Sequence, residues 1–232
     1  LMAVNLERIE QQCTLNNAER QLLTSQRTPI VLLNKRQDCD LPDVIAPGQK
    51  TLGMMLPYTP LHVLLFDALS PDIPFLIMTS ANRSEEPIIC TEDSEDLKKL
   101  ADLSDCLLTH NRPIKARVDD SVVQVLPGEI HPLIIRRARG YAPEPIVGED
   151  AAFSLLAVGA ELKNTFCLTR DQFAFLSQHI GDMENSETLS AFEESVSHYR
   201  HIFRIKPQAV ACDLHPGYLS TRYAESFAEK EQ

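Results

Sequence analysis

The sequence predicts an α/β fold with a twisted, mixed sheet, followed by the start of a second α/β domain. Over residues 5–140, short apolar runs alternate with stretches of helical period, as in a sheet covered by helices. After residue 150, three apolar runs follow closely on one another, before a long amphipathic helix and a fourth run. We therefore expect one domain at residues 1–145 and an incomplete second domain at residues 151–232. The proline-rich stretch 141–150 is the expected linker.

Apolar spacing and helix caps predict the elements of the first part. Leu6, Ile9 and Cys13 recur at helical spacing, and Thr59 before Pro60 is typical of a helix N-terminus. Helices are expected at residues 5–13, at 18–24, from residue 60 onward, and over "EDLKKLADL" behind a cap at Thr91 or Ser94. Buried strands are expected at residues 29–35, 51–56, 75–80, 106–110, 121–126 and 133–140.

In the second part, "FSLLAVGAE", "TFCLTR" and "FAFLSQHIGD" read as three strands joined by short polar turns, which predicts a meander. A helix over 188–205 would carry one apolar face, and residues 209–214 would form a fourth strand. The apolar face consists of Leu189, Phe192, Val196, Tyr199 and Phe203.

Composition narrows the class of protein. Among 232 residues, 44% are hydrophobic and 24% are charged, as in a soluble globular protein with ample core. The formal charge of −11 argues against general binding to nucleic acids or membranes, and no apolar run approaches the roughly 20 residues that span a bilayer. Six cysteines without a CxxC pair indicate free thiols and a reducing cytoplasm. Because the sequence opens without a leader or an obvious cap, we expect a fragment of a longer protein.

Residues 112–139 carry local positive charge in this acidic chain. Six basic side chains stand there against Asp119, Asp120 and Glu129. The basic residues are Arg112, Lys115, Arg117, Arg136, Arg137 and Arg139. Such a stretch suits a small anion such as a nucleotide phosphate. Asp119 and Asp120 are candidates for holding Mg²⁺ beside a triphosphate, although a solvated turn is the alternative.

Small polar residues follow the predicted strand at 75–80. Thr79, Ser80, Asn82 and Ser84 offer hydroxyls and an amide at the edge where ligands of open α/β sheets bind. The alternative is an ordinary turn, which these residue types also favour. The two interpretations remain open on this stretch alone.

Three further places in the first part carry polar groups at the ends of predicted strands. Tyr58, Thr59 and His62 lie at a strand-to-helix turn, where a helix N-terminus can hold an anion or can simply be capped. Ser121 begins a predicted strand. In "IRRARG", alternation along a strand would place Arg137 and Arg139 on the face opposite Arg136. An exposed edge would explain one of these faces.

The second part repeats this pattern. Lys163 and Asn164 lie at the tip of a predicted hairpin, His179 lies near the end of the third strand, and His215 follows the fourth. Each has a structural alternative as a turn or half-buried strand residue. If the strands are neighbours, these polar ends converge as in a nucleotide cleft.

Several long motifs occur in an order that resembles the HypF family, the carbamoyltransferases of nickel–iron hydrogenase maturation. They are "GMMLPYTPLHVLL", "MTSANRSEEPI", "DDSVV", "IRRARGYAP", "AVGAELKNTFCLT", "FLSQHIGD" and "ACDLHPGYLSTR". The resemblance covers the chain from about residue 20. The first part is similar to YrdC domains, and the second to the opening of an actin-like, ribonuclease-H-type domain.

The resemblance implies two reactions. A YrdC-like domain would form carbamoyl-adenylate from carbamoyl phosphate and ATP, and an actin-like domain would pass the carbamoyl group to the C-terminal cysteine of HypE. Carried over by motif, the nucleotide or carbamate contacts and the pocket wall would be Thr79, Ser80, Asn82, Ser121, Arg137, Tyr58, Thr59 and His62. The second cleft would include Lys163, Asn164 and His215.

The sequence also departs from the family pattern. From the resemblance, we expect the acylphosphatase module, the zinc-finger pairs and the beginning of the YrdC-like domain to lie outside this sequence. Ala81 and Glu85 stand where the family has glycines, and Glu85 is expected to alter the loop. The iron or zinc site of the actin-like domain would lie outside this chain, so we expect poor turnover from it alone.

Two other functions are compatible with parts of the sequence. One is a stand-alone YrdC-type nucleotide or RNA-related module of the threonylcarbamoyl-adenylate synthase class, which the long second part and the acidic charge disfavour. The other is a non-catalytic scaffold for maturation proteins. Adenylation requires charge stabilisation rather than a nucleophile, and residues 56–140 contain no evident nucleophile, which favours the enzymatic interpretation.

Overall fold

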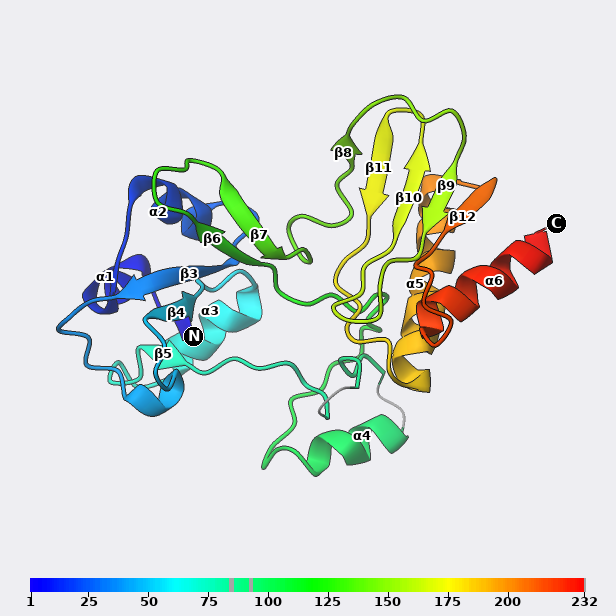
Figure 1. The fold of residues 1–232 in the computed structure, drawn as a ribbon. Helices are drawn as coiled ribbons and strands as arrows, with labels where there is room; N and C mark the ends of the chain where they lie inside the picture. Colours follow the sequence, from blue (N-terminus) through cyan, green and yellow to red (C-terminus); the bar gives the residue numbers. More distant parts are fainter. Residues whose placement is uncertain (84–85, 92–93, 232) are drawn as a thin grey trace. The chain divides into compact units, whose positions relative to one another are not determined.

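The computed structural model describes residues 1–83, 86–91 and 94–231. Its contacts divide the chain into two compact units (Figure 1). The first unit contains residues 1–79 and 120–141, and the second contains residues 80–119 and 142–232. Residues 80–119 thus group with the later part of the chain. The domain limits expected from the sequence, 1–145 and 151–232, remain a prediction.

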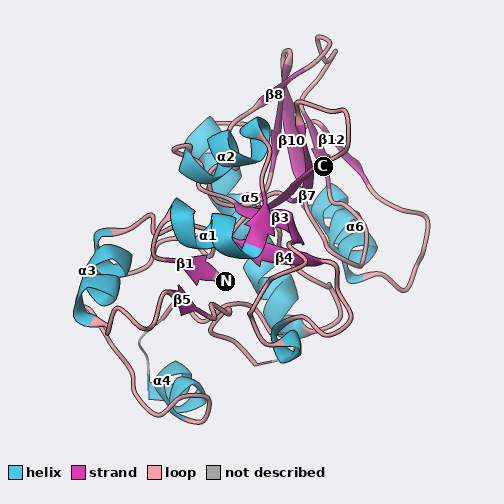
Figure 2. Ribbon diagram, turned by 90° about the vertical axis from the view of Figure 1, so that its left-hand side faces the viewer, coloured by secondary structure: helices cyan, strands magenta, loops and turns pink. Residues whose placement is uncertain are grey.

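The first unit is built on a mixed sheet in which β3 pairs antiparallel with β2 and β4 and parallel with β6, and β6 pairs antiparallel with β7. A separate pair, β1 and β5, lies beside α1 and α3 (Figure 2). The strands are β1 (Met2–Ala3), β2 (Cys13–Thr14), β3 (Ile30–Lys35), β4 (Thr51–Met54), β5 (Phe75–Leu76), β6 (Val122–Val125) and β7 (Pro132–Arg136). The helices are α1 (Leu6–Gln12), α2 (Asn17–Thr24), α3 (Pro60–Ala68) and a short 3-10 turn at Asp43–Ile45.

Local sequence explains where these helices begin. Asn16 and Glu19 form a reciprocal capping box at α2, and the Thr59 side chain accepts the backbone N–H of His62 at α3. Ile9, Leu23, Val31 and their neighbours then bury their side chains in one core. The helix predictions for this unit are confirmed.

The second unit has a five-stranded sheet in the order β12-β9-β10-β11-β8. The predicted meander is confirmed, because β9, β10 and β11 pair antiparallel in sequence order, and β12 adds parallel to β9. One apolar core joins this sheet to α5 and α6 (Figure 1). The elements are α4 (Ser94–Ala101), β8 (Ile146–Val147), β9 (Leu155–Ala157), β10 (Cys167–Arg170), β11 (Phe173–Leu176), α5 (Ser186–Phe203), β12 (Ala209–Ala211) and α6 (Leu219–Glu231).

Three strand predictions need correction. The run 75–80 forms only the two-residue β5, and Ile77 beyond it is 71% exposed, so this is not a buried strand. Residues 106–110 form no strand, and Leu108 is 80% exposed. Strand β7 ends at Arg136, so side-chain alternation does not extend over the arginines that follow. An apolar run alone does not distinguish a strand from an extended loop.

Other elements were not predicted. Strand β8 lies within the expected linker and pairs with β11, and α6 follows a stretch that was interpreted only as a turn. The mixed α/β class itself is confirmed. Among the described residues, no helix is both long and apolar enough to cross a bilayer.

Candidate functional site

Arg139 is the centre of a polar cluster in the first unit, which we call the Arg139 cluster (Tyr58, His62, Asp120 and Arg139). The Arg139 guanidinium lies over the Tyr58 ring, 3.4 Å from its centroid. Its Nε donates to Asp120 Oδ1 at 2.8 Å, and its terminal nitrogens donate to the Arg27 carbonyl and to both oxygens of Thr28. The cluster therefore connects the β4–α3 turn with the start of β6 and the segment after β7.

The β4–α3 turn places Tyr58 and His62 together. Thr59 caps the helix through the His62 backbone N–H at 3.1 Å, which sets the first helical turn. The Tyr58 and His62 rings then meet edge to face, with centroids 4.6 Å apart. The Tyr58 backbone N–H also points to His62 Nδ1 at 3.5 Å. The three predicted wall residues thus form one local group.

Burial shifts the proton affinity of both rings. It raises the pKa of the Tyr58 hydroxyl, with Asp120 adding to the rise and Arg139 opposing it. Burial lowers the pKa of His62, and the nearby Asp120 carboxylate partly offsets this effect. Tyr58 is therefore held as a neutral phenol and His62 is biased toward the neutral imidazole. Both are hydrogen-bonding groups of the kind that can contact an anionic ligand without adding charge.

Ser121 is fully buried and its hydroxyl is used within the chain. It accepts the Ala138 backbone N–H at 2.8 Å and donates to the Arg139 carbonyl at 2.9 Å. Arg137 Nη2 donates to the Tyr141 carbonyl at 2.8 Å. Ser121 thus fixes the backbone segment that carries Arg139. Contacts of Ser121 and Arg137 with a ligand stay predictions.

The predicted residues around Asn82 lie partly in the other unit. Thr79 ends a segment of the first unit, whereas Ser80 and Asn82 belong to the second. Thr79 and Ser80 are exposed. The Asn82 amide donates to the carbonyls of Arg83 and Glu86, both at 2.9 Å, and so closes its own loop. Ser84 and Glu85 lie outside the described residues. Convergence of Asn82 with Ser121 and Arg137 stays a prediction.

The predicted Mg²⁺ ligands have other contacts. Asp120 is bound by Arg139 in a half-buried ion pair. Among the described residues, no group of three or more histidine, cysteine or acidic side chains is arranged to hold a metal ion. Mg²⁺ is commonly held by one or two carboxylates together with substrate phosphates. Asp120 would fit that pattern only in the presence of a nucleotide.

The loop of the second predicted cleft is closed by Asn164. This buried amide donates to the carbonyls of Val158 and Ala160 at 2.9 and 2.6 Å. Its backbone pairs with Gly181. Lys163 has a left-handed φ of 49° and its backbone N–H donates to Asp182 Oδ1 at 2.6 Å. The hairpin tip is thus a hydrogen-bonded turn, and a ligand contact of Lys163 or Asn164 stays a prediction.

His215 occupies a separate turn before α6. Its ring stacks on Tyr218 with centroids 4.3 Å apart, and its Nδ1 accepts the Gly217 backbone N–H. Among the described residues, no hydrogen bond or ring contact joins it to Lys163 or Asn164. Glu161, which sequence reasoning missed, connects the loop of Asn164 to the start of α6. Its Oε2 accepts the backbone N–H of Leu219, the first residue of α6. A carboxylate there complements the helix dipole.

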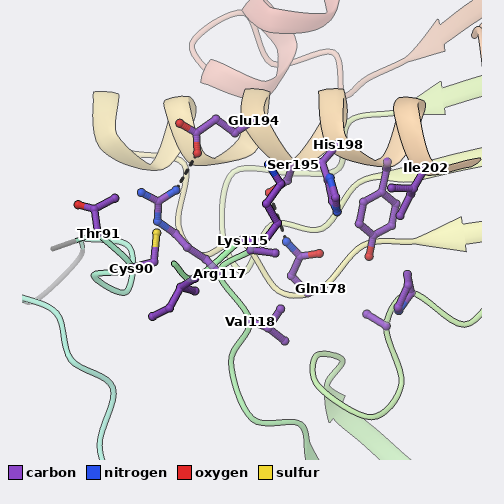
Figure 3. A pocket seen from close by; sticks show the side chains of 15 residues that line it. Cys90, Thr91, Lys115, Arg117, Val118, Gln178, Glu194, Ser195, His198 and Ile202 are labelled. Atoms are coloured by element: carbon purple, nitrogen blue, oxygen red, sulfur yellow. Dashed lines mark hydrogen bonds and ion pairs between the residues drawn. The ribbon is translucent and has the colours of Figure 1, made fainter. Parts of the chain in front are cut away.

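A hollow of about 310 Å³ lies in the second unit, between residues 90–118 and α5 (Figure 3). Its apolar side is formed by Val118, Tyr199 and Ile202 among others. In Figure 3, Arg117 points to Glu194 on the helix, and Gln178 points to Ser195. The polar lining residues include Thr91, Lys115, Arg117, Gln178, Glu194, Ser195 and His198. Its volume is at the lower end for small-molecule pockets.

Sequence reasoning missed parts of both sites. It treated Arg139 as part of a charged stretch and of a predicted strand, but did not name it as a site residue. The pair "DD" before one strand and "RG" after the next nevertheless marks neighbouring strand ends. It did not single out Glu194 or His198, since both lie on the polar face of a helix and carry no motif. The pairing of β6 with β7 brings Arg139 to its partners. The position of α5 brings Glu194 and His198 to the lining of the hollow.

Two family models match the chain, one after the other. Residues 1–138 match the YrdC-containing family described as "Telomere recombination", and residues 150–232 match the "HypF Kae1-like domain". The chain is 42% identical to the carbamoyltransferase HypF of Synechocystis sp. over 229 residues and 44% identical to that of Rhizobium leguminosarum bv. viciae over 230 residues. These matches cover 98% and 97% of the chain but only 29% and 30% of the relatives.

Solved structures give the same result. A full-length HypF crystallised in its phosphate- and nucleotide-bound form is 46% identical, with a TM-score of 0.89 over 97% of this chain and 35% of that one. HypF of T. kodakarensis is 36% identical, with a TM-score of 0.91 over 99% of this chain and 30% of that one. Sequence and fold therefore agree over nearly the whole chain. The chain belongs to the HypF family, and it carries a YrdC-type region followed by a region that matches the HypF Kae1-like domain.

Proposed function

We propose that this protein is a carbamoyltransferase of hydrogenase maturation, which activates carbamate with ATP and passes the carbamoyl group to HypE. The observation that carries the proposal is the similarity to HypF carbamoyltransferases over 98% of the chain, across both regions. Since the chain spans about 30% of those relatives, the complete activity is proposed for the protein in its full natural length. Continuation into a HypF-type second region disfavours a stand-alone YrdC-type synthase.

In the first reaction, water would release carbamate and phosphate from carbamoyl phosphate. A carbamate oxygen would attack the α-phosphorus of ATP, and the bond to pyrophosphate would break, which yields carbamoyl-adenylate. This chemistry needs cations and donors at the departing pyrophosphate rather than a covalent nucleophile. The Arg139 cluster supplies an arginine and two neutral ring groups of that kind. Thr79, Ser80, Asn82 and Arg137 are the proposed further contacts, and Ser121 supports the segment that carries Arg139.

Mg²⁺ would accompany ATP and spread the negative charge of its phosphates. Asp120 is the candidate ligand on this chain, and it would exchange its contact with Arg139 for the metal. In the second reaction, the HypE thiolate would attack the carbamoyl carbon, AMP would leave, and the thiocarbamate would remain on the cysteine for dehydration. Lys163, Asn164 and His215 are the proposed residues of that second cleft.

The test is exchange of labelled pyrophosphate into ATP, measured with the full-length protein in the presence and absence of carbamoyl phosphate. We expect carbamoyl phosphate-dependent exchange. Asn82→Ala should reduce it, whereas Asn111→Ala, which removes an exposed asparagine of the same unit, should leave it intact. Exchange that does not depend on carbamoyl phosphate would refute the adenylation reaction. Normal exchange in Asn82→Ala with an unchanged melting temperature would refute the assignment of Asn82.

A further inference from the structure

We propose that Arg117 is a positioning residue that holds the Asn82 loop (residues 80–83 and 86–91) on helix α5. Its guanidinium makes two contacts in different directions. Nε donates to the carbonyl of Ile88 in the loop at 3.2 Å, and Nη1 donates to Glu194 Oε2 on the helix at 2.8 Å. The catalytic consequence of this role rests on the function proposed above, whereas the contacts themselves do not.

The contact at Ile88 is transmitted to Asn82 through the loop itself. The next residue, Ile89, donates its backbone N–H to the Ala81 carbonyl at 2.9 Å. On the other side, the Asn82 amide donates to the Glu86 carbonyl at 2.9 Å. These two bonds tie both ends of the loop together. A displacement of Ile88 therefore displaces the backbone on which Asn82 stands.

The helix side of the contact is anchored. Neighbours of Glu194 on the apolar face of α5, Phe192 and Val196, are buried in the core of the second unit. Glu194 itself projects from the opposite face toward Arg117 (Figure 3). Because the backbone of the helix is held by its core, Glu194 presents a defined carboxylate, and an arginine fork can contact it and a carbonyl at once.

The contact between Arg117 and Glu194 joins residues from two family-model matches. Arg117 and the Asn82 loop lie in the YrdC-type match, whereas Glu194 lies in the HypF Kae1-like match. Through Arg117, the conformation of the Asn82 loop in the YrdC-type region therefore depends on helix α5 in the Kae1-like region. The Arg117 and Glu194 side chains are 31% and 69% exposed. Exposed pairs of this kind contribute little to folding stability, so a change here should act on the loop rather than on the fold.

Hydrogen exchange on the full-length protein tests the contact without reference to activity. In Arg117→Ala and in Glu194→Gln, we expect the Ile89 amide to exchange about tenfold faster or more, because its bond to Ala81 opens more often. The matched controls are Arg112→Ala and Glu193→Gln, which change exposed neighbours outside the contact. Unaltered exchange at Ile89 in both test variants would overturn the proposal.

Pyrophosphate exchange then tests the consequence. Misplacing a binding group by about 1 Å can cost up to about a hundredfold in rate. We expect Arg117→Ala to lower kcat/KM by about tenfold or more, mainly through the KM for carbamoyl phosphate or ATP, at an unchanged melting temperature. Arg117→Lys should keep part of the activity, whereas Arg117→Glu should lose it even when Glu194→Arg restores the ion pair, because a carboxylate cannot donate to the Ile88 carbonyl.

The outcomes separate the two proposals. If wild-type protein shows no carbamoyl phosphate-dependent exchange, the proposed function fails, and the hydrogen-exchange result still decides whether Arg117 holds the loop. If wild-type exchange is present but Arg117→Ala is as active as Arg112→Ala, the positioning role is refuted and the function stands. A parallel fall in melting temperature and kcat, with no change in KM, would show a general structural effect and would also refute positioning.

Discussion

Arg139 and Asp120 form a 2.8 Å ion pair that joins the segment after β7 to the start of β6. The same guanidinium covers the Tyr58 ring and reaches back to Thr28. One side chain therefore holds four separate stretches of the first unit. This makes Arg139 the residue whose replacement should have the broadest effect on the candidate site.

Replacement of Arg139 should destabilise the first unit. In Arg139→Lys, an ammonium cannot reproduce the fork that bonds Asp120 and Thr28 together. We expect the free energy of unfolding to fall by about 1–3 kcal/mol, measured by urea titration. Arg112→Lys, at an exposed arginine, is the control and should be neutral. An unchanged unfolding midpoint in Arg139→Lys would show that the ion pair does not contribute.

Ser121→Ala should lower the folding stability of the first unit even when no ligand is bound. The substitution leaves the buried Ala138 N–H without its acceptor and removes the donor to the Arg139 carbonyl. Such a loss costs about 1–3 kcal/mol, visible as a lower melting temperature without any substrate present. If the melting temperature is unchanged while pyrophosphate exchange is lost, Ser121 is a ligand contact in its own right.

His62 should make stability depend on pH. Burial lowers the pKa of His62 in the folded protein, so the unfolded chain binds more protons as the pH falls through about 6.5. Neutral His62 therefore contributes to the free energy of unfolding above about pH 6.5, and this contribution is lost as the pH falls below that value. We expect the urea midpoint to fall less between about pH 7.5 and about pH 5.5 in His62→Gln than in wild type.

The control for this experiment is His131→Gln, at an exposed histidine, which should keep the wild-type pH dependence. Asp120→Asn gives a second test, because the Asp120 carboxylate raises the pKa of His62. Its removal should lower that pKa further in an NMR titration. A higher pKa in Asp120→Asn would mean that the loss of Asp120 acts mainly by displacing Arg139.

Gly159→Ala should destabilise the second unit strongly. Gly159 has a φ of +71°, and an added Cβ would lie 2.1 Å from the Thr165 carbonyl oxygen and 3.0 Å from the Asn164 amide. The backbone must move, at a cost of about 2 kcal/mol or more. Gly148→Ala meets no atom within 4 Å and is the matched control. Equal urea midpoints for the two variants would contradict the tight approach at the 158–164 loop.

Elements with local signals were predictable. The capping residues Asn16 and Thr59 mark helix starts because their side chains accept backbone N–H groups only three positions away. The meander β9-β10-β11 was predictable because short turns leave few other pairings. The strand expected at 75–80 was wrong, since whether an apolar run pairs depends on a partner: only Phe75 and Leu76 find one, in β1.

The candidate site shows the same division. The residue types of Tyr58, Thr59 and His62, and their proximity across one turn, could be predicted from spacing. The link from Tyr58 to Arg139 and Asp120 could not, because it depends on the pairing of β6 with β7 and on the direction of one long side chain. Asn82 was predicted as a ligand contact, but its bonds to its own loop emerged only from the structure.

By itself, the sequence determined the α/β class, the starts of the helices in the first unit, the order of most strands and the family, since these depend on periodicity, caps and long motifs along the chain. The tertiary structure alone decided that Arg139 gathers the β4–α3 turn with Asp120, and that Arg117 joins the Asn82 loop to α5. The physical reason is separation: Arg117 and Glu194 are 77 residues apart. A contact at that distance leaves no periodic trace in either segment and exists only once both are folded.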